Sequence, residues 1–397
     1  MTRFRPSDQR ALTEIVQAAV AEEEPLEVIA GGSKRGLGRP IQVPHILDVS
    51  AFSGISAYEP EELVLTAGAA TPLAEIERVL AAAGQMLAFE PPDWRELLGS
   101  EAAASTLGGT IAANLAGPRR VRQGAARDHF LGFHGVSGRG EAFKAGGRVV
   151  KNVTGYDLCK LLAGSHGTLA VLTEVTVKVL PRAEAARSVA LHGLDDAAAL
   201  RAMTAALGSP HEVSGAAHLP KGENGAGAPL TLLRLEGPEP SVKARAAALR
   251  QELAGAGAVE ELSDAESARL WMAVRDVAPL VAPRDRAVWR ISVPPSAGPA
   301  LAAGVARAVD LDYVFDWGGG LVWLAVKGAE DGGAAEIRRR VAQSGGHATL
   351  IRAPDALRLA VPVFQPLPSA LAGLTVRVKD GFDPKRILNR GRMYPEL

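Results

Sequence analysis

The segment Ser105–Gly117, STLGGTIAANLAG, decides how the sequence is interpreted. It carries no charged residue and is built mostly from Gly, Ala, Ser and Thr. A packed core element would use Leu, Ile and Val there, and a solvent-exposed loop would use Lys, Glu and Pro. Small residues allow another group to come close to the backbone. We therefore predict that this segment lies against a ligand, with Ser105, Thr106 and Asn114 as uncharged hydrogen-bonding groups.

A second glycine-centred segment, AGGSKRGLGRP (Ala30–Pro40), follows a short apolar run that predicts a strand. Glycines at such a turn allow successive backbone N–H groups to point toward one anion. Ser33 adds a hydroxyl and Lys34 a charge. The segment is not a P-loop, because Leu37 stands where that motif requires Lys, so a plain turn between strands is the alternative. Together the two segments favour one extended ligand with a pyrophosphate in its middle.

A third segment, Val149–Pro181, predicts a helix, a turn at Gly164 and Gly167, and then a strand. Asp157 is expected to cap the helix or to hold Lys151. Taken alone, this pattern indicates only a helix, a turn and a strand, and does not by itself indicate a binding site. The residues expected on the buried face of the strand alternate with polar ones: Val171, Thr173, Val175, Val177 and Val179.

The totals describe an ordinary globular chain of two or three domains. It has 397 residues, a formal net charge of +0 and one cysteine, and it lacks a long apolar run. These features argue against a nucleic-acid partner, an internal disulfide, a Cys-based metal cluster and a membrane span. The histidine spacing predicts no metal site. A polar start followed by an amphipathic helix is unlike a secretory signal, so a cytoplasmic location is expected.

Taken in chain order, Ala30–Pro40, Ser105–Gly117 and Val149–Pro181, the three segments resemble the FAD-binding domain of the vanillyl-alcohol-oxidase (PCMH-type) flavoproteins. From GGSKRGLGRP through WRISVPP to FDPKRILNRGRMY, the chain is also similar to the FAD-binding subunits of bacterial glycolate oxidase. The resemblance implies an α+β fold with a two-subdomain FAD-binding domain, residues 1–183. A small α+β cap domain with an antiparallel sheet follows, residues 184–353, and residues 354–397 return to the first domain.

The resemblance also implies which residues contact FAD. Some relatives tether the flavin through a histidine after the first glycine pair, whereas Ser33 and Lys34 stand there in this chain, so a non-covalent cofactor is expected. The implied cofactor-binding residues are Ala30, Gly31, Gly32, Ser33, Lys34, Arg35, Pro91, Ser105, Thr106, Gly108, Gly109, Ala112, Asn114, Gly164, Gly167, Val171 and Asn389.

The function implied is that of an FAD subunit of glycolate oxidase or dehydrogenase. Glycolate would become glyoxylate, a hydride would pass to flavin N5, and electrons would continue to an iron–sulfur subunit beside a larger FAD subunit. Through such a complex the chain would lie at the periphery of the inner membrane.

Residues for the substrate side are proposed on chemical grounds. Relatives that oxidise 2-hydroxy acids often carry paired histidines in the cap, and residues 184–350 hold no such pair. The remaining candidates are His347, Arg352 and Arg290, with Arg275 as a further arginine able to hold a carboxylate by two hydrogen bonds. Three hypotheses stay open: a working substrate pocket in this chain, an electron-relay or assembly role, and a stand-alone oxidase that uses O₂.

Overall fold

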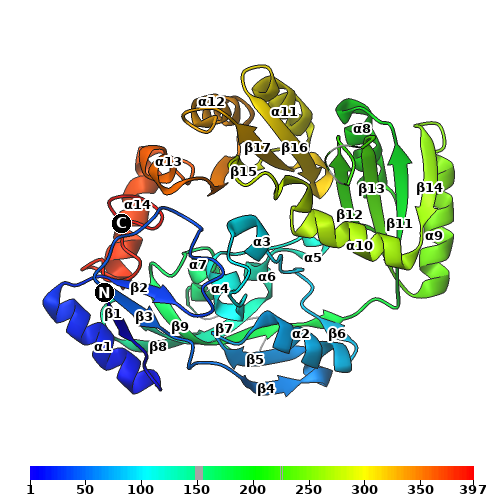
Figure 1. The fold of residues 1–397 in the computed structure, drawn as a ribbon. Coiled ribbons are helices and arrows are strands. Elements are labelled where there is room, and N and C mark those ends of the chain that lie inside the picture. Colours follow the sequence, from blue (N-terminus) through cyan, green and yellow to red (C-terminus); the bar gives the residue numbers. More distant parts are fainter. Residues whose placement is uncertain (148–154, 224, 226) are drawn as a thin grey trace.

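The computed structural model describes residues 1–147, 155–223, 225 and 227–397. Figure 1 shows two layered parts with short helices between them. One part contains the N-terminal elements and the C-terminal helix, and the other is built on a single large sheet. No helix among the described residues is long and apolar enough to cross a membrane.

The N-terminal part begins with a small parallel sheet, strand order β1-β3-β2. Helix α1 packs its Leu12, Val16 and Ala19 stripe beneath it. The bounds of these elements are β1 Thr2–Phe4, α1 Gln9–Glu22, β2 Leu26–Ile29 and β3 His45–Asp48.

A five-stranded antiparallel sheet follows, in the order β4-β5-β9-β7-β8. Its third strand is the predicted alternating one, and all five residues expected on its buried face are buried. The strands are β4 Ile55–Glu59, β5 Val64–Gly68, β7 Phe130–Ser137, β8 Ala142–Gly146 and β9 Ala170–Lys178; β6 Gln85–Met86 and β10 Leu180–Pro181 form a separate pair.

Short helices lie between this sheet and the second part (Figure 1). The segment Ser105–Gly117 contains α4. Thr106 is the N-cap residue of this helix, and its hydroxyl accepts a hydrogen bond from Gly109 N. Asp157 caps α7 by accepting from Lys160 N, while Lys151 lies outside the described residues. The helices are α2 Leu73–Ala82, α3 Arg95–Leu98, α4 Leu107–Ala112, α5 Arg120–Gln123, α6 Ala126–His129 and α7 Leu158–Leu162.

The second part is an eight-stranded antiparallel sheet, in the order β14-β11-β13-β12-β16-β17-β15-β18. Its strands are β11 Ala185–His192, β12 Val213–Leu219, β13 Leu230–Gly237, β14 Ala258–Leu262, β15 Ala287–Ser292, β16 Asp310–Asp316, β17 Leu321–Lys327 and β18 His347–Arg352.

Four helices cover the outer face of this sheet, as expected for an α+β cap. They are α8 Asp196–Gly208, α9 Glu239–Glu252, α11 Gly298–Ala306 and α12 Ala334–Ser344. Helix α10, Asp264–Arg275, departs from the expectation: its Leu270 and Trp271 pack on the inner face. They join Trp94 and Leu97 of the first part in one apolar cluster, because the inner face also needs a cover.

The chain then returns to its beginning. After α13, Asp355–Ala360, and α14, Ser369–Phe382, the tail pairs Leu388 with Leu26 of β2. Single 3-10 turns η1 to η4 cover Pro60–Glu62, Ala278–Leu280, Pro295–Ala297 and Trp317–Gly319. The division into units at residues 183/184 and 353/354 stays a prediction.

Candidate functional site

Segments far apart in the sequence meet around one hollow of about 140 Å³. The two glycine-centred segments join through Ala104 N, which donates to Gly31 O over 3.1 Å. The third segment joins through His166 N, which donates to Ala112 O over 2.8 Å. The C-terminal tail completes the wall of the hollow, because the Asn389 side chain accepts a hydrogen bond from Val28 N and donates one to His166 O.

Most residues predicted to bind a dinucleotide lie in the wall of this hollow. The predicted residues found there are Ala30, Gly31, Gly32, Ser33, Lys34, Arg35, Thr106, Gly108, Gly109, Ala112, Gly167, Val171 and Asn389.

Four predicted residues do not line this hollow. Pro91 and Ser105 line a neighbouring depression, although the Ser105 hydroxyl also accepts from Lys34 Nζ over 3.3 Å. Asn114 has a positive φ of 48°, and its side-chain oxygen accepts from Arg127 N. Gly164 lies next to it, since a Cβ there would be 3.4 Å from the Asn114 Cβ. None of these four residues lines the hollow itself.

Sequence reasoning missed three polar residues of the wall, Ser165, His166 and Arg392. Burial, together with Arg392, lowers the pKa of His166 to about 4, so its imidazole is neutral near pH 7. Arg392 donates to Arg35 O and Leu37 O and pairs with Glu27, which fixes the first glycine loop. The only sequence signal for Arg392 was its place in the tail motif.

The hollow has the donors that a pyrophosphate requires. Lys34 Nζ lies 3.2 Å from the Ser33 hydroxyl, at the wall. Within the described part of the chain, the backbone N–H groups of Gly31, Gly32 and Lys34 donate to no other residue. Burial lowers the pKa of Lys34 to about 8, against the opposing effect of Asp93. An ammonium and unpaired N–H groups in one concave wall fit a doubly charged anion.

FAD affinity is expected to fall as the pH rises above about 8. Because the ammonium form of Lys34 binds the anion, binding at higher pH must first take up a proton. The loss is up to roughly tenfold per pH unit, with little change below pH 7. Fluorescence titration of FAD at pH 7, 8 and 9 measures it. A flat wild-type profile would contradict the role of Lys34, and Lys34→Met should be flat.

Gly31→Ala is expected to separate the two glycine segments. A Cβ at Gly31 would stand 2.1 Å from Ala104 O, a backbone atom that cannot rotate away. We expect a loss of about 1–3 kcal/mol in unfolding free energy and weaker FAD binding. Urea unfolding and FAD titration measure the two effects. Gly381→Ala in α14 is the control, since a Cβ there meets nothing within 4 Å; equal behaviour of the two variants would refute the packing argument.

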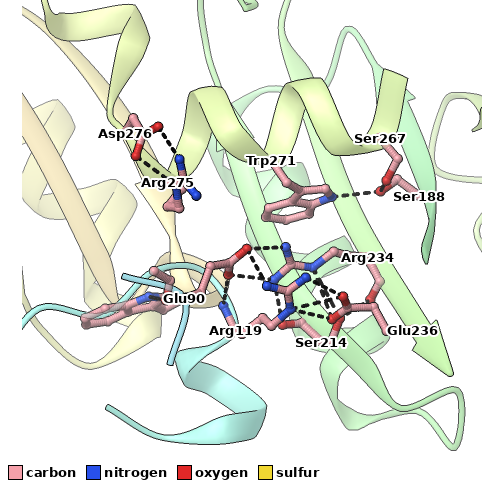
Figure 2. A network of polar contacts seen from close by, with 12 residues as sticks. Glu90, Arg119, Ser188, Ser214, Arg234, Glu236, Ser267, Trp271, Arg275 and Asp276 are labelled. Atoms are coloured by element: carbon pink, nitrogen blue, oxygen red, sulfur yellow. Dashed lines mark hydrogen bonds and ion pairs between the residues drawn. The ribbon is translucent and has the colours of Figure 1, made fainter. Parts of the chain in front are cut away.

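A buried ionic network joins the two parts of the molecule (Figure 2). Arg234 of β13 donates to both oxygens of Glu90, over 2.8 and 3.0 Å. Arg119 pairs with Glu90 at 3.0 Å and with Glu236 of β13 at 2.7 Å. The Arg234 guanidinium also lies 4.5 Å from the ring centre of Trp271. Two carboxylates and two guanidinium groups thus bind the cap to Glu90, which precedes α3, and to Arg119, which precedes α5.

Two of the arginines proposed for substrate already have protein partners. Arg352 donates to the carbonyl oxygens of Leu97, Leu280, Val281, Pro283 and Arg286. Arg275 forms a two-pronged ion pair with Asp276. The Arg352 donors link β18 to α3 and η2, and those of Arg275 are used by the neighbouring carboxylate, so we leave both out of the proposed substrate site.

The other two candidates lie side by side in the cap sheet. Arg290 pairs with Thr349 and Ser292 with His347 in the β15–β18 ladder, so these residues share the inner face. Burial lowers the pKa of His347, as do Arg290 and Arg120. Neither residue belongs to the wall of the hollow.

Comparison with known proteins agrees with this geometry. Residues 3–146 match the family described as "FAD binding domain". The fold is similar to that of p-cresol methylhydroxylase, with a TM-score of 0.73, 14% identity, and coverage of 99% of this chain and 88% of that one. The sequence is 37% identical to glycolate oxidase subunit GlcE of Escherichia coli K12 over 98% of each chain. It is also 40% identical to glycolate oxidase subunit GlcD of Bacillus subtilis, over 28% of this chain and 23% of that one.

The fold and the matched domain define the class: a flavoprotein with a PCMH-type FAD-binding domain. Within that class, the end-to-end likeness is specific. The chain belongs to the family of the glycolate oxidase subunit GlcE.

Proposed function

We propose that this chain is the FAD-holding subunit of a glycolate oxidase, in which glycolate is converted to glyoxylate. The observation that carries the proposal is the hollow itself, where Lys34 and unpaired backbone N–H groups meet in a chain similar to GlcE along its whole length. FAD, when bound, supplies the acceptor for a hydride from the substrate α-carbon. The chain's own residues bind it, orient it and keep water away.

The cofactor is proposed to be non-covalent. Ser33 and Lys34 follow the glycine pair, so no histidine or cysteine side chain stands at that place to form a bond to the flavin. Acid precipitation of the purified chain should leave the yellow colour in the supernatant. Colour that stays with the precipitated chain would contradict this.

A larger FAD subunit and an iron–sulfur subunit are the proposed partners, in a cytoplasmic complex at the periphery of the inner membrane. The likeness to both GlcE and GlcD supports an assembly of several subunits. Co-purification followed by mass spectrometry tests cofactor and partners together.

An electron-relay or assembly role is the second candidate. It is favoured by the hydrogen bonds that Arg352 makes to carbonyl oxygens and Arg275 makes to Asp276, which leave fewer groups for substrate than the sequence suggested. Anaerobic glycolate added to the isolated, FAD-loaded chain separates the candidates. Bleaching of the flavin absorbance supports oxidation by this chain, and an unchanged spectrum supports the relay role. Failure of the chain to take up FAD would overturn both.

A further inference from the structure

Two arginines from different parts of the molecule meet on one indole ring. The guanidinium carbon of Arg120, in α5, lies 4.3 Å from the ring centre of Trp317. That of Arg290, in β15, lies 5.0 Å from the same ring centre. Trp317 itself is buried and fixed, because its Nε1 donates to Gly117 O over 3.2 Å. The last residue of the STLGGTIAANLAG segment therefore positions the ring that both arginines share.

Neither guanidinium has a hydrogen-bond acceptor among the residues that the structure describes. In the described residues, no carboxylate or carbonyl oxygen accepts a hydrogen bond from the side chain of Arg120 or Arg290. This contrasts with Arg352, Arg275, Arg119 and Arg234, each of which donates to a carboxylate or a carbonyl oxygen of the chain. Two like charges held near each other repel, and an anion that contacts both would relieve the repulsion.

The surroundings add a polar group but little negative charge. His347 lies on the same sheet face as Arg290, and its side chain is exposed. On the cap side, burial lowers the pKa of Arg290, and the charge of the buried Asp316 opposes that shift. The Asp316 side-chain oxygen accepts from Trp317 N over 2.7 Å. Burial raises the pKa of Asp316 to about 7, so it offsets the arginines only in part near neutral pH.

We propose that Arg120 and Arg290 together bind the carboxylate of a small organic acid against Trp317, with His347 beside it. Arginine suits this task because its planar fork matches the two carboxylate oxygens. The site depends on the closed contact between α5 and the cap, since one arginine comes from each side. The inference deepens the proposed function and rests on it only for the identity of the acid as a 2-hydroxy acid.

Calorimetric titration of the FAD-loaded full chain tests the site. Oxalate serves as a carboxylate that cannot donate a hydride, oxamide as its neutral counterpart, and inorganic phosphate as a different anion. We expect oxalate to bind and oxamide not to bind. Arg120→Ala and Arg290→Ala should each weaken oxalate binding by roughly tenfold or more, as loss of a charged donor implies. Arg120→Lys should recover part of the affinity.

Arg122→Ala is the matched control, because Arg122 lies on the same helix and pairs instead with Glu212. It should bind oxalate like the wild type. Unchanged oxalate affinity in Arg120→Ala, no oxalate binding by the wild type, or tighter binding of phosphate than of oxalate would each overturn the inference. Because Arg120 is exposed, Arg120→Ala is expected to fold, and it tests the proposed carboxylate site even if Arg290→Ala does not fold. Flavin absorbance of each sample reports the proposed FAD function separately.

Discussion

Glu90→Gln is expected to lower the free energy of unfolding by about 3–5 kcal/mol, the cost of leaving buried charge without its partner. Glu90 is buried and accepts from Arg234 and Arg119, so its loss as an anion leaves two guanidinium groups to share Glu236 alone. Burial by itself would raise the pKa of Glu90, but these arginines lower it, so the group is ionised near neutral pH. Urea unfolding followed by tryptophan fluorescence measures the effect.

Glu212→Gln is the control for this prediction. Glu212 pairs with Arg122, but both side chains are more than half exposed, at 57% and 51%. The expected cost is about 0–1 kcal/mol, since water solvates both groups when the pair is broken. Should Glu90→Gln unfold as the control does, the network would not be what holds the cap against the FAD-binding part.

Lys34→Met is expected to weaken FAD binding by roughly ten- to 150-fold, which corresponds to the loss of one charged hydrogen-bond donor. The same change should stabilise the FAD-free chain. Burial lowers the pKa of Lys34 to about 8, which means that the folded chain holds the ammonium less readily than the unfolded chain does near neutral pH. Methionine has similar length and carries no charge to bury.

The opposite signs make this prediction easy to check. FAD affinity is measured by fluorescence titration, and the stability of the FAD-free chain by thermal unfolding. Lys144→Met, on the exposed side of β8, should change neither. Lower affinity together with lower stability would indicate general damage to the loop, and unchanged affinity would remove Lys34 from the pyrophosphate site.

Local patterns in the sequence predicted several elements correctly. Alternation at Val171, Thr173 and Val175 predicted β9, because a strand turns every second side chain to one face. The glycine-centred segments predicted turns whose backbone lies close to a ligand. For Gly31 and Gly108, however, the close neighbours in the structure are Ala104 and Ala69 of the chain itself. Small residues therefore allow the segments that form the wall to pack closely against each other, and they also shape the hollow.

Side-chain roles that depend on distant partners could not be predicted. Arg352 was expected to hold a substrate, yet its donors are taken by carbonyl oxygens 66 to 255 positions away. The Glu90–Arg234 pair spans 144 positions. A spacing pattern reports neighbours within a few residues and contains nothing about which carbonyl or carboxylate the fold brings near.

The sequence by itself determined the class of this protein and its cofactor segments, because strand alternation, glycine turns and family motifs are local properties of the chain. Only the tertiary structure decided which arginines are free to bind an anion. Arg275 and Arg352 lose that freedom to Asp276 and to backbone carbonyls, whereas Arg120 and Arg290 share Trp317 without an acceptor among the described residues. A guanidinium group can bind a ligand only with donors that the folded chain has not already used.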